Sequence, residues 1–453
     1  MRRTLPAILI SAAALCFVSA GDDAAMRSWP SWRGPLHTGV APHGDPPLEW
    51  SETKNLRWKA ELPGPGHATP VVWEDRIYVL SAVRTEKTGA PPAQAALPPQ
   101  PATAAPGGRD APERPTQVHQ FVVSAHDRRS GKELWRRVVR EAVPREAGHS
   151  TSSHASASPI TDGRHLYASF GSYGIYCLDL DGNVKWEVDL GDMTTRNQFG
   201  EGTSPALSGD TLLVNWDHEE GSFIVGLDKL TGKERWRTAR DEPTSWSTPL
   251  IVEDGGRALA VVSATKRVRA YDVATGAEVW QCGGLGANCI PSPVAAVGLV
   301  FVMSGYREAA AMAIRYPGAR GDLTGGSAVA WRTDQGLSYV PSPLLYDGRL
   351  YLLERFQGML SCLDIASGKP FYAKQRLEGM GNIYASPVGA SGRVYLLDRD
   401  GNAMVLRHAE TFEIMARNKL DDGFDASPVI AGDALYLRGH RSLYSLAASP
   451  AAP

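Results

Sequence analysis

Eight short segments carry the residues that could do chemistry, and each segment ends in a Ser-Pro or Thr-Pro dipeptide. Their side chains are imidazoles, carboxylates, amides and aromatic rings, which serve proteins as acids and bases, metal ligands and stacking platforms. Polar residues of these types also line any water-filled channel, so composition alone does not separate a ligand site from a solvated one. The candidates are His67, His149, His154, Gln198, Glu201, Trp246, Asn288, Tyr339, Asn382, Tyr384 and Asp425.

Three of these residues are suited to a planar ligand and a cation. The indole ring of Trp246 could stack on a planar molecule. Glu201 and Asn288 could together hold a hard cation such as Ca²⁺ through oxygen atoms. These residue types favour a site for a small charged molecule, provided that the fold brings the three segments together.

The histidines allow two further arrangements. His149 and His154 flank three serines, but the sequence places no third group that would complete a nucleophilic triad. His67, His149 and His154 could bind zinc, although the spacing of the last two is a weak signal in a segment that reads as a loop. Neither arrangement has a specific motif behind it.

The elements that must position these residues form an internal repeat. From Pro159 to Pro428 the Ser/Thr-Pro dipeptides recur about every 45 residues, and each unit reads as four short strands separated by turns. Four strands in a repeat of this length are typical of a propeller blade. The loop before each dipeptide should then lie at the entrance of a central funnel. The prolines of the dipeptides are Pro70, Pro159, Pro205, Pro249, Pro293, Pro343, Pro387 and Pro428.

A turn motif with the pattern Asp-x-x-Ser/Thr-Gly-x-x-x-Trp supports this interpretation. The Asp and Ser/Thr side chains can bond to the turn backbone, and glycine allows a positive φ. The tryptophan supplies an apolar plate that can pack against the next blade. We therefore expect most of the 12 tryptophans to be structural, whereas Trp246 lies outside the motif. The structural set is Trp58, Trp135, Trp186, Trp236, Trp280 and Trp331.

The two ends of the chain complete the count of blades. The last repeat shows only three strands after Ser427, and residues 55–59 resemble an isolated fourth strand with its tryptophan. Pairing these segments would close the ring and remove the exposed sheet edges. The sequence thus predicts an all-β fold with one eight-bladed propeller over residues 49–447, a lead segment at 21–48 and a C-terminal tail at 448–453.

One loop of the first repeat is much longer than its counterparts. Residues 84–118 are rich in proline and alanine, and we expect them to form a disordered insertion, because such a composition cannot bury a core. The insertion lies between two expected strands, so it lengthens one loop and does not separate two domains.

Residues 1–20 have the pattern of a secretory signal peptide. Two arginines precede an apolar run, and small residues lead to a cleavage site near Ala20. No later apolar segment is long enough to span a membrane, so we expect a periplasmic or secreted protein.

Export permits disulfides, and Cys282 and Cys289 could form a local bridge. A net charge of −2 gives no sign of nucleic-acid binding.

The turns and the N-terminal stretch WPSWRGPLHTGV resemble those of pyrroloquinoline quinone (PQQ)-like repeat propellers, over about residues 29–447. That superfamily includes quinoprotein alcohol dehydrogenases and the propeller lipoprotein of the outer-membrane barrel-assembly machinery. In the dehydrogenases a Glu and an Asn bind Ca²⁺, a Trp stacks on the quinone and an Asp acts as the base. The resemblance implies these roles for Glu201, Asn288, Trp246 and, by a looser analogy, Asp425.

The chain also departs from the dehydrogenases. It has no adjacent pair of cysteines and no Cys-x-x-Cys-His motif for a covalent haem. We therefore expect a monomeric binding or scaffold protein of the cell envelope that has no cofactor and no catalytic role. Its partner would be an envelope protein, a peptide or a small molecule. The alternative is an alcohol or sugar dehydrogenase with PQQ and Ca²⁺ in the funnel.

Overall fold

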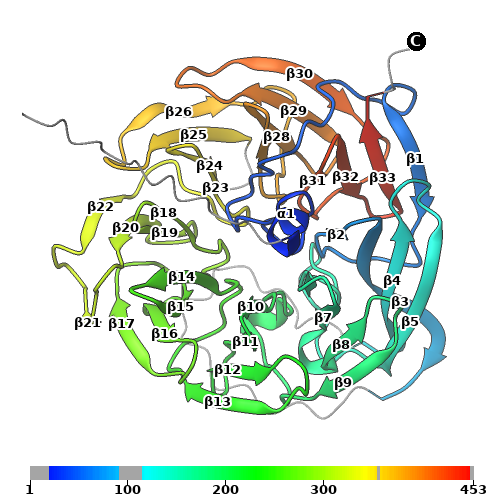
Figure 1. Cartoon of the computed structure of the whole chain (residues 1–453), viewed down its shortest axis with the longest axis horizontal. Coiled ribbons are helices and arrows are strands. Elements are labelled where there is room, and N and C mark those ends of the chain that lie inside the picture. The colour runs from blue at the N-terminus through cyan, green and yellow to red at the C-terminus, as the bar shows by residue number, and fades with distance from the viewer. Residues whose placement is uncertain (1–19, 91–114, 355–357, 449–453) are drawn as a thin grey trace, which may run out of the picture.

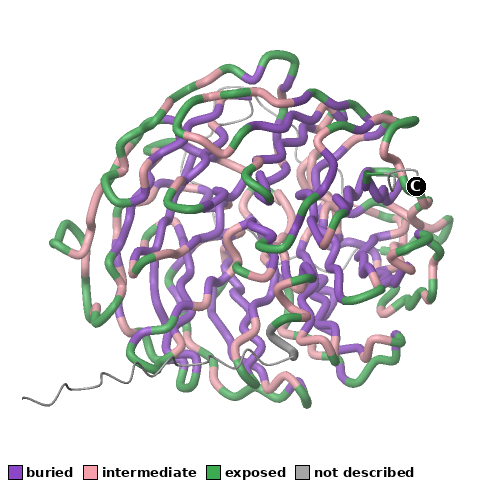
Figure 2. Tube along the Cα trace, turned by 45° about the horizontal axis from the view of Figure 1, so that its top comes forward, coloured by how far each residue is buried: buried purple, intermediate pink, exposed green. Residues whose placement is uncertain are grey.

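The computed structural model describes residues 20–90, 115–354 and 358–448, and these residues form a ring of eight sheets (Figure 1). The sheets stand around a central axis like the blades of a propeller, which confirms the predicted all-β, eight-bladed fold. The inner strands are buried between blades, whereas the outer strands expose alternate side chains at the rim (Figure 2). Residues 1–19 of the expected signal peptide and most of the tail lie outside the described residues.

The first four blades follow one another along the chain, and each begins with its innermost strand. Blade 1 contains β2 (Val71–Trp73), β3 (Arg76–Thr88), β4 (Gln117–Asp127) and β5 (Glu133–Ala142). Blade 2 contains β6 (Ile160–Thr161), β7 (His165–Ser169), β8 (Ile175–Asp179) and β9 (Val184–Val188). Blade 3 contains β10 (Ala206–Ser208), β11 (Thr211–Trp216), β12 (Phe223–Asp228) and β13 (Glu234–Ala239). Blade 4 contains β14 (Leu250–Asp254), β15 (Arg257–Val262), β16 (Val268–Asp272), β17 (Glu278–Cys282) and the added strand β21 (Gly321–Asp322).

The remaining four blades repeat this order, and the last one takes its outer strand from the start of the chain. Blade 5 contains β18 (Val294–Ala296), β19 (Leu299–Ser304), β20 (Ala310–Arg315) and β22 (Val329–Thr333). Blade 6 contains β23 (Leu344–Tyr346), β24 (Arg349–Glu354), β25 (Met359–Asp364) and β26 (Pro370–Arg376). Blade 7 contains β27 (Val388–Ala390), β28 (Arg393–Leu397), β29 (Asn402–Arg407) and β30 (Ile414–Lys419). Blade 8 contains β31 (Val429–Ala431), β32 (Ala434–Arg438), β33 (Ser442–Ala447) and β1 (Leu56–Glu61).

The Ser/Thr residue of each dipeptide belongs to a closed ring of hydrogen bonds around the channel. Its backbone N–H donates to the hydroxyl oxygen of the corresponding residue in the next blade, over 2.8–3.2 Å. The last member, Ser427, donates to the first, Thr69, and completes the circle. A hydroxyl is therefore needed at every one of these positions, which explains the repeated dipeptide. The members are Thr69, Ser158, Ser204, Thr248, Ser292, Ser342, Ser386 and Ser427.

Tryptophans of the turn motif join neighbouring blades at the rim at five of the eight junctions, as predicted. The indole N–H of Trp186 donates to the carbonyl oxygen of Lys229 in blade 3, over 2.9 Å. Its ring covers Gly232, where a Cβ atom would come within 2.8 Å of the indole. The motif glycine thus supplies both a positive φ and room for the ring. Trp58, Trp135, Trp236 and Trp331 make the same indole-to-carbonyl bond to the following blade.

Trp280 differs from this pattern. It is fully buried, but its indole N–H has no hydrogen-bond partner among the described residues. The next blade lacks the Asp-x-x-Thr-Gly turn, so no motif carbonyl is presented to the ring. Instead, β21 pairs in parallel with β17, with Gly321 opposite Trp280. Trp280 therefore keeps the predicted structural role, because its ring is packed in the core, but it lacks the indole hydrogen bond of the other motif tryptophans.

The ring closes as the sequence predicted. β1 pairs antiparallel with β33, with Lys59 opposite Tyr444 and Ala60 opposite Leu443. The first strand after the lead segment therefore completes the sheet that the end of the chain begins. This pairing covers the edge of β33, so the eighth blade has the same four strands as its neighbours.

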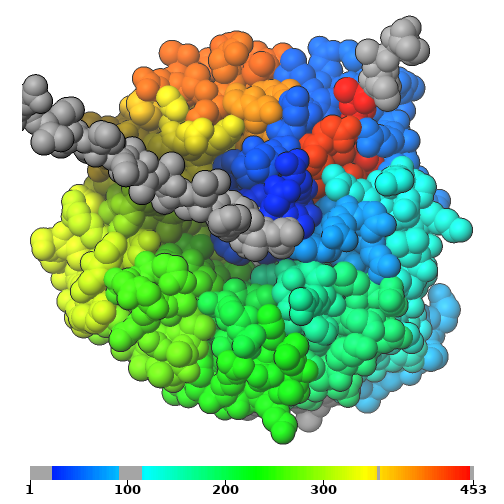
Figure 3. Space-filling view, viewed as in Figure 1, coloured from blue at the N-terminus to red at the C-terminus, as the bar shows by residue number. Residues whose placement is uncertain are grey.

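The lead segment lies across one end of the channel. It begins with α1 (Ala20–Met26) and runs over the centre of the ring (Figure 3). The guanidinium group of the buried Arg33 donates to the carbonyl oxygens of Pro343 and Pro387, each over 2.9 Å. These contacts tie the lead to blades 6 and 7 and close this end of the channel.

Two sequence predictions need correction. β3 continues to Thr88 and β4 begins at Gln117, so the strand pair extends into the insertion expected at 84–118. Residues 91–114 of that insertion lie outside the described residues. Cys282 and Cys289 are buried free thiols, each directed at a glycine carbonyl oxygen, so the local bridge is not formed. In the described part of the chain, no helix is both long and apolar enough to cross a membrane.

Candidate functional site

A cavity of about 410 Å³ lies at the end of the channel opposite the bulk of the lead segment. The loops that enter the first strands build its wall, and Trp32 of the lead reaches it from the channel side. A volume of this size suits a small molecule or a short extended segment of a protein. The lining residues are Trp32, His67, Thr69, His149, Thr151, Ser152, Ser156, Ser158, Phe199, Gly200, Glu201, Gly202, Ser204, Trp246, Ile290, Tyr339, Val340, Tyr384, Ser386, Asp425 and Ser427.

Most of the predicted funnel residues do line this cavity. They come from segments far apart in the sequence, and the closed ring brings them to one place. The predicted residues that line it are His67, His149, Glu201, Trp246, Tyr339, Tyr384 and Asp425.

Four predicted residues lie elsewhere. His154 packs edge-on against His119 of β4, with 5.2 Å between the ring centres. Asn288 is buried behind the wall and donates from Nδ2 to the hydroxyl of Tyr339 over 3.3 Å. Gln198 ends the 3₁₀ turn η2 (Arg196–Gln198), and Asn382 is exposed.

Glu201 has the most strongly shifted carboxyl pKa in the cavity wall. Its carboxylate accepts hydrogen bonds from the backbone N–H and the hydroxyl of Ser172, which belongs to the 3₁₀ turn η1 (Gly171–Tyr173). Burial raises the pKa of Glu201 to about 7, because these two hydrogen bonds offset the loss of solvation only in part. The side chain therefore changes its charge near neutral pH.

Trp246 is held in place by its loop. The indole N–H donates to the carbonyl oxygen of Gly200 over 2.7 Å, and the backbone N–H donates to that of Cys289 over 2.9 Å. The ring of Phe199 lies 6.4 Å from the indole at a tilt of 36°. These contacts fix the ring in the cavity wall before any ligand binds.

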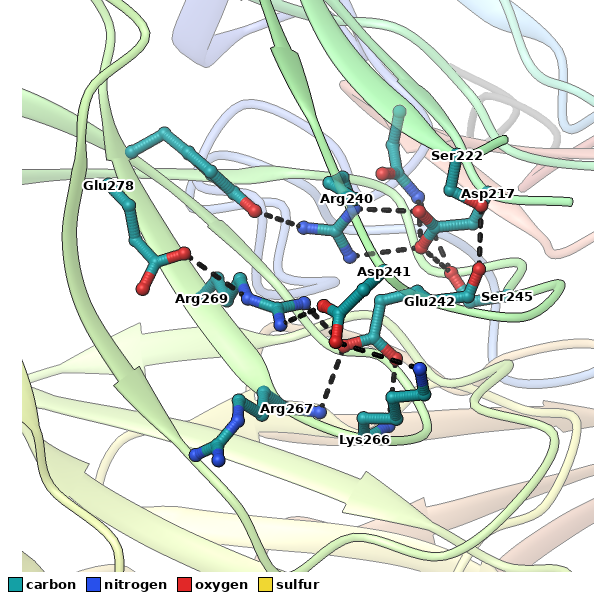
Figure 4. Close-up of polar contacts among 12 residues, drawn as sticks. Asp217, Ser222, Arg240, Asp241, Glu242, Ser245, Lys266, Arg267, Arg269 and Glu278 are labelled. Carbon is teal, nitrogen blue, oxygen red and sulfur yellow. Dashed lines mark hydrogen bonds and ion pairs between the residues drawn. The ribbon is translucent and has the colours of Figure 1, made fainter.

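A buried ion network positions the loop that carries Trp246 (Figure 4). Arg240 and Asp217 form a bidentate ion pair in which both side chains are fully buried. Nε of Arg240 donates to Oδ1 over 2.6 Å, and Nη2 donates to Oδ2 over 3.0 Å. Ser245, next to Trp246, donates to the same carboxylate over 2.6 Å. Glu242 accepts from the backbone N–H of Lys266 in blade 4 over 2.8 Å. Because these charges are paired with one another, we interpret the network as structural.

Asp425 lies within a cluster of cationic and imidazole groups. Its carboxylate faces Arg399, with 2.6 Å from Nε to Oδ1, and His440, with 2.7 Å from Nε2 to Oδ2. Nε2 of His67 lies 3.3 Å from Oδ2. Burial acts to raise the pKa of Asp425, but the hydrogen bond from His440 and the nearby charges outweigh it and hold that pKa below its usual range. Burial lowers the pKa of His67 to about 4, so its imidazole is neutral at neutral pH.

The sequence did not single out Arg399 and His440, which lie on turns between the second and third strands of blades 7 and 8. In an antiparallel blade this turn lies at the same end as the loop that enters the first strand. Inspecting those turns together with the loops would have found both residues. No signal in the repeat pattern points to Trp32, because the lead segment is not part of a repeat.

The expected cation pair is only partly assembled. Glu201 lines the cavity, but its oxygens are engaged by Ser172, and Asn288 lies behind Tyr339. The amide oxygen of Asn288 is buried and has no hydrogen-bond partner in the described residues, and Asn288 is not among the residues that line the cavity. Of the expected pair, only Glu201 therefore lines the cavity. Trp246 does stand in the wall, where a planar ring could stack.

The fold and the funnel define a class, the eight-bladed propeller with a ligand-sized cavity on its axis. Within that class, the profile of the family described as "Outer membrane protein assembly factor BamB" matches residues 119–371 and 220–449. The chain belongs to this family of PQQ-like propellers. A search of curated proteins gave no significant match.

Solved structures agree with this assignment of the fold. BamB from Moraxella catarrhalis is 15% identical, with a TM-score of 0.52, and the match covers 73% of this chain and 90% of that one. Quinohemoprotein alcohol dehydrogenase from Comamonas testosteroni is 10% identical, with a TM-score of 0.59 and coverage of 95% and 82%. Quinohemoprotein alcohol dehydrogenase ADHIIG from Pseudomonas putida HK5 is 12% identical, with a TM-score of 0.56 and coverage of 96% and 83%. At these identities the likeness concerns the fold alone.

Proposed function

We propose that this protein is an exported binding or scaffold protein of the cell envelope, which holds a ligand in its central funnel without catalysis. The observation that carries the proposal is the cavity of about 410 Å³, whose wall combines aromatic rings with hydroxyl, imidazole and carboxylate groups. Membership of the family described as an outer membrane protein assembly factor supports an envelope role. The ligand would be an envelope protein, a peptide or a small molecule.

The closed architecture suits this role. The ring of hydrogen bonds among the Ser/Thr residues ties each blade to the next, and docked tryptophans strengthen five of these junctions. The loops of the funnel therefore stand on a rigid frame. A rigid frame lowers the entropy that would be lost on binding. We expect a monomer, because the chain itself completes the ring.

Photo-crosslinking in intact exporting cells tests this proposal. A photoreactive phenylalanine in place of Tyr384 lies in the cavity wall, whereas one in place of Val297, which is 82% exposed on the turn after β18, lies outside it. We expect the Tyr384 position to give a defined adduct with an envelope component and the Val297 position to give none. No adduct from Tyr384, or the same products from both positions, would count against a funnel ligand.

A quinone-dependent dehydrogenase is the second candidate, favoured by the presence of Trp246 and Glu201 in one cavity wall. PQQ, when bound, would supply the redox chemistry, and Trp246 would provide the stacking surface. The incomplete pairing of Glu201 with Asn288 weakens this candidate.

Adding PQQ and Ca²⁺ to the purified protein separates the two functions. A dehydrogenase would retain the quinone chromophore through gel filtration and reduce a dye in the presence of an alcohol. Trp246→Ala should then abolish retention, whereas Phe371→Ala, which removes an exposed aromatic ring on β26, should not. If the wild-type protein retains no quinone at high micromolar concentration, the dehydrogenase candidate is rejected.

A further inference from the structure

Three side chains at the mouth of the funnel present their ligand atoms to one point. His67 comes from the loop that enters blade 1, Asp425 from the loop that enters blade 8, and His440 from the turn between β32 and β33. Oδ2 of Asp425 lies 2.7 Å from Nε2 of His440 and 3.3 Å from Nε2 of His67, and one ligand atom of each residue lies within 4.8 Å of the others. We propose that these three residues bind a zinc-class divalent cation.

The donor set suits this class of metal. Zinc binds imidazole nitrogen and carboxylate oxygen at about 2.0–2.2 Å, so a small inward movement of each ligand atom would bring all three into range. Calcium and magnesium prefer sets made of oxygen alone, and therefore match two imidazoles poorly. The three residues converge only because β1 closes the ring, which places blade 8 beside blade 1.

The carboxylate is already oriented for binding. Nη2 of Arg399 donates to Oδ2 of Asp425 over 3.2 Å, and its Nε lies 2.6 Å from Oδ1 in an ion-pair contact. The guanidinium group lies over the ring of Tyr384 at 4.8 Å. These contacts fix the plane of the Asp425 carboxylate, whose Oδ2 faces the two imidazoles, whereas Oδ1 accepts no hydrogen bond from the described residues and is open to a metal. Carboxylate ligands of metals are commonly held by such an outer hydrogen bond.

The charges around the trio indicate which ligand would complete the site. Arg399 neutralises Asp425, and the buried Arg438 adds another positive charge close to His67. Two neutral imidazoles leave the charge of the metal uncompensated. His67 and Asp425 line the cavity, so the open coordination position faces it. We therefore expect the fourth ligand to be an anionic oxygen, such as hydroxide or the carboxylate of a bound molecule.

The metal site can be tested independently of the proposed binding function, because the test uses the metal alone. The full exported chain is stripped with a chelator and then titrated with Zn²⁺ by calorimetry, and with Co²⁺ followed by visible absorption. We expect one ion per chain, a cobalt band typical of nitrogen and oxygen ligands, and a higher unfolding temperature with metal.

Variants locate the ion. His440→Ala removes a ligand whose side chain is 40% exposed, so folding should survive, and His67→Ala removes the second imidazole. Loss of an outer partner costs about 10- to 100-fold in affinity, so loss of a ligand should cost at least about 100-fold. His43→Ala, which removes an exposed histidine of the lead segment, is the matched control and should bind like the wild type.

Two results would overturn the proposal. One is a wild-type chain that binds no Zn²⁺ at about 100 μM, a concentration far above that needed by sites built of three protein ligands. The other is a His67→Ala/His440→Ala double variant that keeps the stoichiometry and affinity of the wild type. Circular dichroism of the metal-free variants shows whether any loss of binding comes from misfolding.

Discussion

The carboxyl group of Glu201 makes the charge of the funnel wall depend on pH near neutrality. Its pKa of about 7 lies above the ordinary value of 4.5, so between these values the folded chain holds more protons than the unfolded chain. The stability that this raised pKa provides is complete below pH 4.5 and is lost as the pH rises through 7. The cause is burial, because the two hydrogen bonds from Ser172 favour the charged form.

We predict that Glu201→Gln flattens this pH dependence, because the amide stays neutral. Between pH 5 and pH 8 the free energy of unfolding of the wild type should fall by about 2 kcal/mol relative to that of the variant. Urea unfolding at several pH values measures the difference. A constant difference across this range would show that Glu201 does not change its charge between pH 5 and pH 8.

The buried pair of Arg240 and Asp217 gives a second prediction. Asp217→Asn leaves a guanidinium charge without its partner in a fully buried position, which should cost about 3–5 kcal/mol of unfolding free energy. Asp241→Asn is the control, since Asp241 is 66% exposed where it pairs with Arg269 and should contribute no more than about 1 kcal/mol. Chemical denaturation of both variants provides the comparison, and equal losses would refute a special role for the buried pair.

At the scale of elements, the turn glycines do more than form turns. Gly232 has a φ of +70°, and a Cβ atom there would lie 2.8 Å from the ring of Trp186. Gly209 has a φ of +54° but open space around it. An alanine at Gly209 therefore meets only backbone strain, whereas an alanine at Gly232 also pushes the tryptophan off the next blade.

We predict that Gly232→Ala lowers the free energy of unfolding by about 1–3 kcal/mol more than Gly209→Ala does. The fluorescence of the displaced indole should also shift to the red as the ring becomes wetter. Thermal and urea unfolding with fluorescence detection test this. Equal effects of the two substitutions would mean that the contact between Gly232 and Trp186 does not matter for stability.

The sequence predicted the parts of these elements that repeat. Eight copies of the Ser/Thr-Pro dipeptide indicated eight blades, and the turn motif identified the docking of Trp186 and its counterparts. Trp280 was not distinguished, because the feature that changes its environment lies in the next blade. The sequence predicted the site residues that lie on the loops entering the blades, such as Trp246. It did not predict the residues on the turns between second and third strands, such as His440.

The closed ring of the whole molecule depends on β1, a strand from the start of the chain that completes the last blade. β1 covers the edge of β33, and Trp58 of β1 donates its indole N–H to Arg128 of blade 1 over 3.1 Å. The lead segment closes the channel separately, through Arg33. The short strand was recognised because its tryptophan matches the repeat, whereas the closing role of the lead could not be inferred from a segment without a repeat.

Two truncated chains separate these contributions. Both lack the lead segment, but a chain that begins at Ser51 keeps β1, whereas one that begins at Leu62 loses it. We predict that the first stays monomeric, and that the second associates through the bare edge of β33 and unfolds at a lower temperature, because unpaired edges invite pairing between chains. Light scattering after gel filtration and calorimetry measure both effects. A peptide of residues 51–61 added to the shorter chain should restore the monomer, since it supplies the missing strand. If the shorter chain is monomeric and as stable as the longer one, the pairing of β1 with β33 does not hold the ring closed.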